Sequence, residues 1–253
     1  MDLGVSGLKA IILGGSRGIG WYTAELLRRE GASVAICARG AEGVASAVQN
    51  LQSLGEGTVF GAAVDLENGE ATRAFCRDAI EALGGCDLLI HNASGFGQPE
   101  GEDGWMRSFQ IDMMAGVRAA EECEAALEAS DAASITFVGS MASKYYFGRS
   151  SSYGPAKGAM RVYANELAQR LGPKRIRANV VSPGAVWFPG GSWDQRKTES
   201  PKFYAAVEKA IPLGRLGTGE ELARIIAFVA SPAGVWINAA HIAADGGQVA
   251  SVD

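Results

Sequence analysis

The sequence predicts an α/β protein with one doubly wound domain, in which a parallel seven-stranded sheet carries helices on both faces. The stretch AIILGGSRGIG, residues 10–20, joins an apolar run to a glycine-rich turn and then to a helical pattern. Short apolar runs then alternate with longer segments of helical periodicity up to residue 243, which is typical of a parallel sheet with crossover helices. The 253 residues suffice for one large core, and no stretch is typical of a linker.

Local patterns predict the elements in order. Short apolar segments are expected to be strands at 10–13, 33–37, 58–64, 86–90, 134–138, 177–181 and 240–243. Apolar residues at helical spacing predict helices at 19–29, 41–54, 68–83, 105–128 and 219–230. Another helix is expected to begin near Ser151 or Ser152, because Pro155 is tolerated only in a first helical turn. Residues 187–210 lack clear periodicity and are interpreted as part of a substrate lid at about 186–212.

Composition excludes several classes of protein. A net charge of −5 and a pI of about 5.2 argue against a nucleic-acid partner. No apolar run approaches the roughly 20 residues that span a bilayer, and the first residues lack the pattern of a signal peptide. Two histidines cannot supply a His-rich metal site, so no metal is expected. The cysteines lie in apolar segments without Cys-x-x-Cys spacing, which predicts buried thiols and a cytoplasmic location: Cys37, Cys76, Cys86 and Cys123.

The glycine-rich turn has the sequence of a phosphate cradle. Its glycines let the backbone turn sharply and approach a ligand, and the N–H groups of the following helix face negative charge. The spacing Gly-x3-Gly-x-Gly differs from the G-x-G-x-x-G fingerprint, and the lack of Gly-Lys-Ser/Thr excludes an ATP or GTP P-loop. The residues expected to hold the cofactor here are Gly14, Ser16, Arg17, Gly18, Ile19 and Gly20.

Two arginines predict that the ligand carries a ribose 2′-phosphate. A dinucleotide-binding fold reads the ribose at the end of the second strand, where an NAD-binding protein has Asp or Glu. This sequence has Ala38 and then Arg39. With Arg17 in the glycine loop, Arg39 provides guanidinium groups that bind phosphate in a bidentate fork. The alternative is that both arginines are solvated surface charges.

Ser140, Tyr153 and Lys157 form a further motif. Tyr153 and Lys157 are four residues apart and share one helix face, while Ser140 follows the fifth expected strand. Together with the glycine loop, this Ser–Tyr–Lys pattern resembles the centre of the classical short-chain dehydrogenase/reductase family, including its 3-oxoacyl thioester reductases. The resemblance covers nearly the whole chain. It implies a Rossmann-type domain, NADP(H) as cofactor and a homo-oligomer, dimer or tetramer.

The resemblance also implies further cofactor contacts. In the family, an acidic residue after the third strand accepts a hydrogen bond from the adenine amino group, and Asp65 matches it. From the residues alone, Asp65 could equally cap the next helix. The turn after the fourth strand resembles Asn-Asn-Ala-Gly, and Pro-Gly-x-Val resembles the turn that holds the nicotinamide. The residues assigned in this way are Asp65, Leu66, Asn92, Ala93, Tyr153, Lys157, Pro183, Gly184 and Val186.

The chain departs from the family pattern at four positions, one of which is Ser94, which precedes the glycine of the turn. His91 replaces the first Asn of the turn and is interpreted as a buried, hydrogen-bonded histidine. Asp112 stands where the family has a catalytic Asn, whose backbone carbonyl helps to hold a water connected to the lysine. Asp112 can replace that Asn in part, and its carboxylate near Lys157 would stabilise the ammonium. Phe188 stands where the family often has Thr.

Hydride transfer to a carbonyl leaves an alkoxide that needs a proton. A free tyrosine has a pKa of about 10, and a nearby ammonium favours its ionised form. Tyr153 is therefore the expected acid and base, with Lys157 beside it and also holding the cofactor ribose. The Ser140 hydroxyl is expected to donate to the carbonyl oxygen. The alternatives are that Ser140 caps a loop, Tyr153 is an interface aromatic and Lys157 is a surface charge.

Aromatic residues gather in loops beyond the carboxyl ends of the expected strands, where ligands bind in this class of fold. Residues 95–97, 141–150 and 186–204 hold nine of the twenty aromatic residues, whereas loops are normally polar. This predicts an apolar pocket for a bulky or aromatic ketone or secondary alcohol. Packing of the lid, or a subunit contact, is the alternative. The side chains assigned to the substrate are Ser140, Phe147, Tyr153, Trp187 and Phe188.

The sequence therefore predicts an NADPH-dependent carbonyl reductase that acts on a small-molecule ketone or alcohol. A 3-oxoacyl thioester reductase is one alternative. The other is a non-catalytic NADP(H)-binding sensor on the same fold, because fold does not fix function. The intact Ser140, Tyr153 and Lys157 argue against the sensor.

Overall fold

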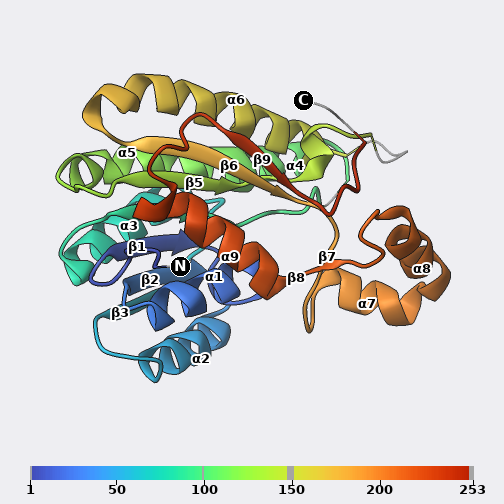
Figure 1. The fold of residues 1–253 in the computed structure, drawn as a ribbon, viewed down its shortest axis with the longest axis horizontal. Coiled ribbons are helices and arrows are strands. Elements are labelled where there is room, and N and C mark those ends of the chain that lie inside the picture. Colours follow the sequence, from blue (N-terminus) through green and yellow to red (C-terminus); the bar gives the residue numbers. More distant parts are fainter. Residues whose placement is uncertain (1, 99, 147–150, 251–253) are drawn as a thin grey trace.

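A parallel seven-stranded sheet forms the centre of the molecule in the computed structural model (Figure 1). The structure describes residues 2–98, 100–146 and 151–250. In spatial order the strands are β3 (Val59–Ala63), β2 (Ser33–Ala38), β1 (Lys9–Leu13), β4 (Leu88–His91), β5 (Ser134–Val138), β6 (Arg177–Pro183) and β9 (His241–Ala244). The predicted fold class is confirmed, and each predicted strand ends within two residues of its expected bounds.

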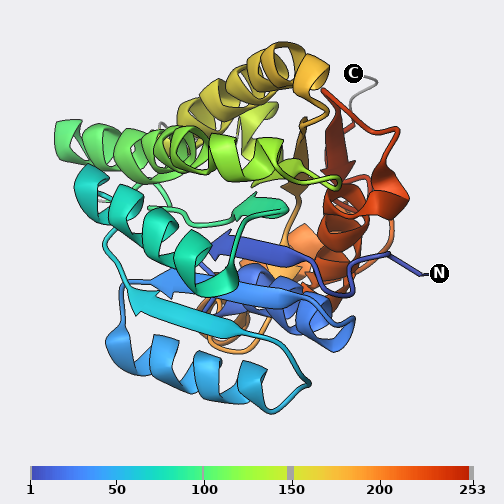
Figure 2. The same cartoon turned by 90° about the vertical axis from the view of Figure 1, so that its left-hand side faces the viewer.

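Helices cover both faces of this sheet (Figures 1 and 2). One face carries α3 (Gly69–Leu83), α5 (Ala115–Glu128) and α6 (Tyr153–Leu171), and the other carries α1 (Gly18–Arg29), α2 (Ala41–Gln52) and α9 (Gly219–Ala230). Ile11 and Leu13 of β1 pack into the first core and Ile12 into the second, all fully buried. A strand covered on both faces is apolar along its whole length. These strands can therefore be recognised in the sequence as continuous apolar runs. The four cysteines are buried free thiols, as predicted.

The strand order reverses between β1 and β4, which is where this class of sheet binds ligands. The loops that follow these two strands are tied together, because the Asn92 side-chain amide donates to the Gly14 carbonyl at 2.8 Å. The end of β2 joins them, since Gly14 N donates to the Cys37 carbonyl at 2.9 Å. These hydrogen bonds therefore connect the carboxyl ends of β1, β2 and β4 at one edge of the sheet.

Residues 102–128 form an interrupted helix, so the prediction of one regular helix over 105–128 is wrong. They comprise α4 (Glu102–Ser108), a π-helical turn (Phe109–Met114) and α5. The wider π turn shifts the face that points inward, and Ile111 and Asp112 are buried. Of the apolar residues on one side of this predicted helix, Met113 packs against the core, whereas Met106 is 59% exposed and Phe109 is 36% exposed. A subunit contact through Met106 and Phe109 stays a prediction.

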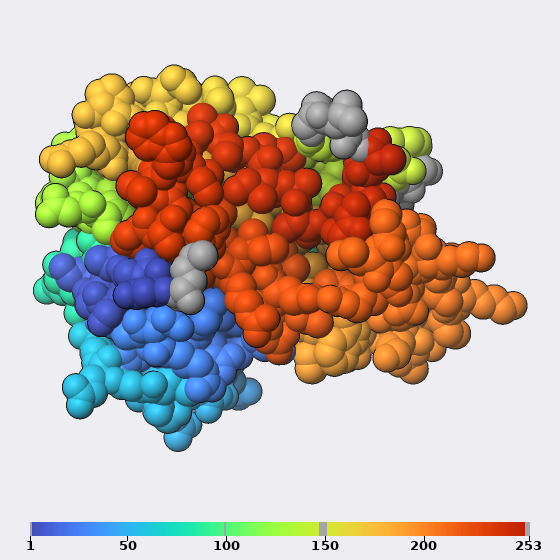
Figure 3. Space-filling view, viewed as in Figure 1, coloured from blue at the N-terminus to red at the C-terminus, as the bar shows by residue number. Residues whose placement is uncertain are grey.

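The chain between β6 and α9 forms a separate outgrowth. β7 (Val186–Trp187) and β8 (Gly217–Thr218) make a small parallel ladder, and α7 (Ser192–Glu199) and α8 (Pro201–Ala210) stand out from the body at the right of Figures 1 and 3. No helix was expected here. Neither α7 nor α8 buries a residue fully, and α7 carries no strong hydrophobic period. In the described part of the chain, no helix is long and apolar enough to span a bilayer.

Candidate active site

The loop between β1 and α1 fits a dinucleotide phosphate. Gly14 and Gly18 have φ of 84° and 58°, which favour glycine. A Cβ added at Gly20 would lie 2.1 Å from the Gly14 carbonyl oxygen, so a larger residue would disrupt the cradle. The N-cap residue of α1, Arg17, makes no side-chain capping bond, which leaves the first N–H groups of the helix available to an anion.

Arg17 and Arg39 place positive charge beside this cradle. Both side chains are exposed, and Arg39 directly follows β2. Among the described residues, neither guanidinium forms an ion pair with a carboxylate, whereas Arg29 of α1 pairs with Glu25. The two charges are therefore uncompensated, which suits an anionic group such as a 2′-phosphate.

The other predicted cofactor residues lie around the same edge. Ala93 packs against the glycine loop, because a Cβ at Gly14 would lie 2.8 Å from the Ala93 Cα. Leu66 is buried and Asp65 is exposed. Asp65 accepts a hydrogen bond from Glu67 N at 3.1 Å, while α3 is capped by Asn68. Asp65 is therefore not the helix cap, which removes the alternative interpretation of this residue.

Ser140 and Tyr153 are brought together by the end of β5 and the start of α6. The Ser140 hydroxyl accepts a hydrogen bond from Ala142 N at 3.1 Å and begins a short turn. A Cβ at Gly154 would lie 2.8 Å from the Ala142 carbonyl oxygen, so the first turn of α6 packs directly on that turn. Lys157 lies one helical turn beyond Tyr153, with its Nζ 5.8 Å from the Tyr153 ring centroid. The predicted trio thus shares one corner of the molecule.

Asp112 joins this corner from the π-helical turn. Its Oδ1 lies 3.2 Å from Lys157 Nζ, and both side chains are almost completely buried. Its Oδ2 accepts a hydrogen bond from Gly95 N at 3.0 Å. Lys157 Nζ also donates to the Val138 carbonyl at 2.9 Å. The carboxylate expected near Lys157 therefore lies next to it, as part of a buried ion pair.

His91 lies behind the ion pair. Its Nε2 is 3.2 Å from the Asp112 carbonyl oxygen, and its ring meets Phe137 edge-on at 6.2 Å. Burial, together with the nearby Lys157 ammonium, lowers the pKa of His91 to about 4. His91 is therefore a neutral, buried, hydrogen-bonded histidine at neutral pH, in agreement with its interpretation from the sequence.

The predicted nicotinamide turn begins where β6 ends. Pro183 is the last residue of β6 and Val186 the first of β7. Gly184 has close neighbours, because a Cβ there would lie 2.7 Å from the Gln248 Oε1. This turn leads directly into the outgrowth of α7 and α8, so the predicted cofactor and substrate segments are continuous.

The predicted substrate residues of that segment have different neighbours. Trp187 donates from Nε1 to Asp194 Oδ1 at 3.0 Å. The Phe188 ring lies against the glycine loop, since a Cβ at Gly18 would be 2.7 Å from its Cζ. Phe188 therefore spans the space between the outgrowth and the predicted cofactor cradle. Phe147 lies outside the described residues.

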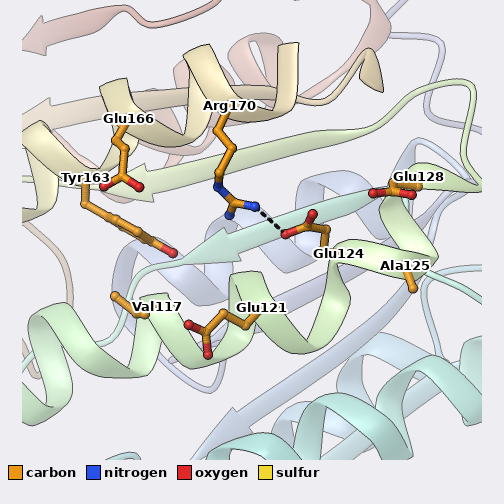
Figure 4. A pocket seen from close by; sticks show the side chains of 8 residues that line it. All are labelled: Val117, Glu121, Glu124, Ala125, Glu128, Tyr163, Glu166 and Arg170. Atoms are coloured by element: carbon orange, nitrogen blue, oxygen red, sulfur yellow. Dashed lines mark hydrogen bonds and ion pairs between the residues drawn. The ribbon is translucent and has the colours of Figure 1, made fainter. Parts of the chain in front are cut away.

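A hollow of about 560 Å³ lies elsewhere, between α5 and α6 (Figure 4). Arg170 crosses it to pair with Glu124 at 2.9 Å. Half of its lining residues are glutamates: Val117, Glu121, Glu124, Ala125, Glu128, Tyr163, Glu166 and Arg170. None of these is a predicted site residue, so the hollow is separate from the candidate active site.

The Gly95 amide and the Phe96 ring are site features that the sequence did not assign. Gly95 contacts Asp112 through its backbone, which no residue pattern reports. Phe96 stands among the loop aromatics, yet its stacking on Tyr153 depends on a left-handed backbone. The Phe-Gly pair after a strand is the one signal that could have suggested such a turn.

This fold, with the predicted Ser–Tyr–Lys residues grouped beside a glycine loop, is that of a dinucleotide-binding oxidoreductase. Residues 14–248 match the family model described as enoyl-(acyl carrier protein) reductase. The chain is 33% identical over 247 residues to isoepoxydon dehydrogenase patN of Aspergillus clavatus, which covers 96% of this chain and 95% of the relative. It therefore belongs to the short-chain dehydrogenase/reductase family, whose members are nicotinamide-dependent oxidoreductases of alcohol and carbonyl groups.

Further relatives agree with this assignment. A rhamnolipid-biosynthesis 3-oxoacyl-[acyl-carrier-protein] reductase of Pseudomonas aeruginosa is 30% identical over 252 residues, covering 96% of each chain. The solved L-sorbose reductase of Gluconobacter frateurii, complexed with NADPH and L-sorbose, superposes with a TM-score of 0.91 at 26% identity over the full length of both chains. The prediction of a nicotinamide cofactor is confirmed, and NADPH-bound neighbours agree with the predicted NADP(H).

Proposed function

We propose that this protein is an NADPH-dependent carbonyl reductase for bulky or aromatic ketones, reversible as an alcohol dehydrogenase. The observation that carries the proposal is the corner formed by Ser140, Tyr153 and Lys157, beside a glycine loop with two arginines that have no carboxylate partner among the described residues. Neither the corner nor the loop alone would suffice. A sensor would need the loop but would not need the acid–base group.

Each side chain has one task in this reaction. The nicotinamide, when bound, supplies or accepts the hydride. The Tyr153 hydroxyl gives its proton to the carbonyl oxygen, and the Ser140 hydroxyl donates a hydrogen bond to the same oxygen. The positive charge of Lys157 stabilises the phenolate that remains. Asp112 holds that ammonium from behind, because the two groups form a buried pair at 3.2 Å.

The substrate class rests on the aromatic segments. We propose that Trp187 and Phe188 border the substrate, since the Phe188 ring lies against the glycine loop and Trp187 directly precedes it. Trp193 stacks on Phe203 at 5.9 Å in the outgrowth, which we propose acts as the substrate lid at about 186–212. Such walls favour an apolar ligand with one polar end. The relative from Pseudomonas aeruginosa supports 3-oxoacyl thioesters as a second candidate, and the L-sorbose reductase is the neighbour that would favour a small polar ketone.

A turnover screen tests the proposal. The consumption of NADPH is followed with acetophenone, L-sorbose and acetoacetyl thioester, and again with NADH. We expect the highest kcat/KM for the aryl ketone with NADPH. A preference for L-sorbose would mean that the aromatics serve packing only. Tight binding of NADPH with no turnover of any carbonyl would favour the sensor.

We also propose that the protein is a cytoplasmic homo-oligomer, either a dimer or a tetramer. Exposed Met106, Phe109 and Val162 supply apolar surface that a second subunit could cover. The free, buried cysteines suit a reducing compartment. Light scattering after gel filtration measures the subunit number.

A further inference from the structure

Phe96 has a backbone conformation that side chains rarely adopt. Its φ of 57° lies in the left-handed region, where any residue with a Cβ is disfavoured. Burial does not compensate for this strain, because the residue is 61% exposed. Strained residues that persist at a candidate site are held by their surroundings, and the strain is often part of the function.

Three contacts hold the loop that carries Phe96. Gly95 N donates to Asp112 Oδ2 at 3.0 Å, and Phe96 N donates to Ser94 Oγ at 3.0 Å. On the other side, Gly97 presses on the start of α6, because a Cβ there would lie 3.2 Å from the Tyr153 Cβ. The loop is therefore fixed both to the carboxylate that pairs with Lys157 and to the helix that carries Tyr153.

The Phe96 ring lies stacked beside the ring of Tyr153. Their centroids are 6.5 Å apart and their planes differ by 21°. Because most of Phe96 remains exposed, this stack leaves aromatic surface free for a ligand. The result is a flat apolar wall next to the proposed proton donor.

We propose that Phe96 is a specificity-determining residue that favours flat cyclic ketones and alcohols over open-chain ones. The inference rests on the proposed function, since it takes Tyr153 as the group that meets the carbonyl oxygen. A rigid ring can lie against the wall without loss of internal freedom, whereas an alkyl chain has to be ordered first. Asp112 acts as a positioning residue, because one carboxylate fixes both Lys157 and Gly95.

Two ketones with ten carbons each test this inference: flat 1-tetralone and open-chain 2-decanone. Phe96→Asn removes the ring and tolerates the left-handed backbone, and Phe96→Tyr keeps the ring. We expect Phe96→Asn to lower the tetralone-to-decanone ratio of kcat/KM by about three- to tenfold, as expected for one lost aromatic stack. Phe96→Tyr should keep the ratio. Trp236→Ala, which alters a side chain that is 98% exposed, serves as the matched control and should also keep it.

An unchanged ratio in Phe96→Asn, or an equal loss for both ketones with a lower Tm, would overturn the inference. Dissociation constants of both ketones are measured in parallel for the complex with NADP+, in which no hydride donor is present. If the wild type reduces neither ketone, the proposed function fails. The ratio of the dissociation constants then decides whether Phe96 selects the flat ring.

Discussion

At the scale of single residues, Asp112 contacts both Lys157 and the loop that contains Gly95. One oxygen pairs with the buried Lys157 ammonium, and the other accepts from the Gly95 amide. An Asn in its place keeps an acceptor but loses the negative charge. Removing one charge of a buried pair leaves the other uncompensated, so the effect has to appear in the ionisation of the site.

We predict that Asp112→Asn gives an active enzyme with a displaced pH profile. The variant removes a negative charge that lies 3.2 Å from Lys157 Nζ, so a limb of the pH profile of kcat/KM should move. Steady-state rates across pH measure this limb. Glu220→Gln, at an exposed position on α9, should leave the profile in place. A profile of Asp112→Asn that matches the wild type would place Asp112 outside the proton path.

The second prediction at the residue scale concerns Arg39 and the preference for NADPH over NADH. Arg39→Asp puts a carboxylate where the 2′-phosphate is expected, so the NADPH-to-NADH ratio of kcat/KM should fall by at least about tenfold, given the strength of charged hydrogen bonds. Arg29→Asp changes charge equally on an exposed part of α1 and should keep the ratio. If both variants keep it, Arg39 is a solvated surface charge.

At the scale of elements, the sequence predicted the strands and helices whose buried residues form a regular apolar pattern. β1 and its neighbours are covered on both faces, so their apolar runs mark them, and Gly219–Ala230 is a helix with the predicted bounds. The π-helical turn could not be predicted, because its extra residue changes no composition pattern. The hydrogen bond from Gly95 N to Asp112 could not be predicted either, because a backbone amide leaves no pattern in the sequence. The site trio could be predicted because Tyr153 and Lys157 share one helix face, whereas the Phe96 wall depends on a φ value.

The end of α9 gives a prediction on stability. Arg177 lies in β6 and is 9% exposed, and it donates to the carbonyls of Val229, Ala230, Ser231 and Ile237 at 2.8 to 3.1 Å. Arg177→Met should lower the free energy of unfolding by about 2–4 kcal/mol, because buried carbonyls lose their donors. Urea unfolding measures it. Arg29→Met, with the arginine side chain 58% exposed, should change it by less than about 0.5 kcal/mol. Equal stabilities would contradict this account of Arg177.

At the scale of the whole molecule, ionisable groups whose pKa changes on folding couple stability to pH. The folded protein holds the pKa of His91 at about 4, whereas an unfolded histidine has a pKa of about 6.5. Between these values the unfolded chain binds more protons, so stability falls as the pH falls through this window. The Arg215 guanidinium lowers the pKa of Glu221 to about 2. Glu221 therefore changes the pH dependence of stability only below about pH 4.3, outside the range in which His91 acts.

We therefore predict that His91→Asn flattens the pH dependence of stability between about pH 6.5 and 4. In the wild type, the His91 contribution to this fall should be about 3 kcal/mol, from a difference of about 2.5 pKa units. Urea unfolding at several pH values measures both proteins. A slope that persists unchanged in His91→Asn would show that another group titrates there.

The central claim is that Tyr153 is the proton donor of an NADPH-dependent carbonyl reductase. Tyr153→Phe keeps the ring and the stack with Phe96 but removes the hydroxyl. The decisive measurement is the kcat for reduction of an aryl ketone by this variant, together with its dissociation constant for NADPH. We predict a fall in kcat of at least about 100-fold with NADPH binding unchanged. Wild-type turnover in Tyr153→Phe would contradict the claim, because another group would then have to supply the proton.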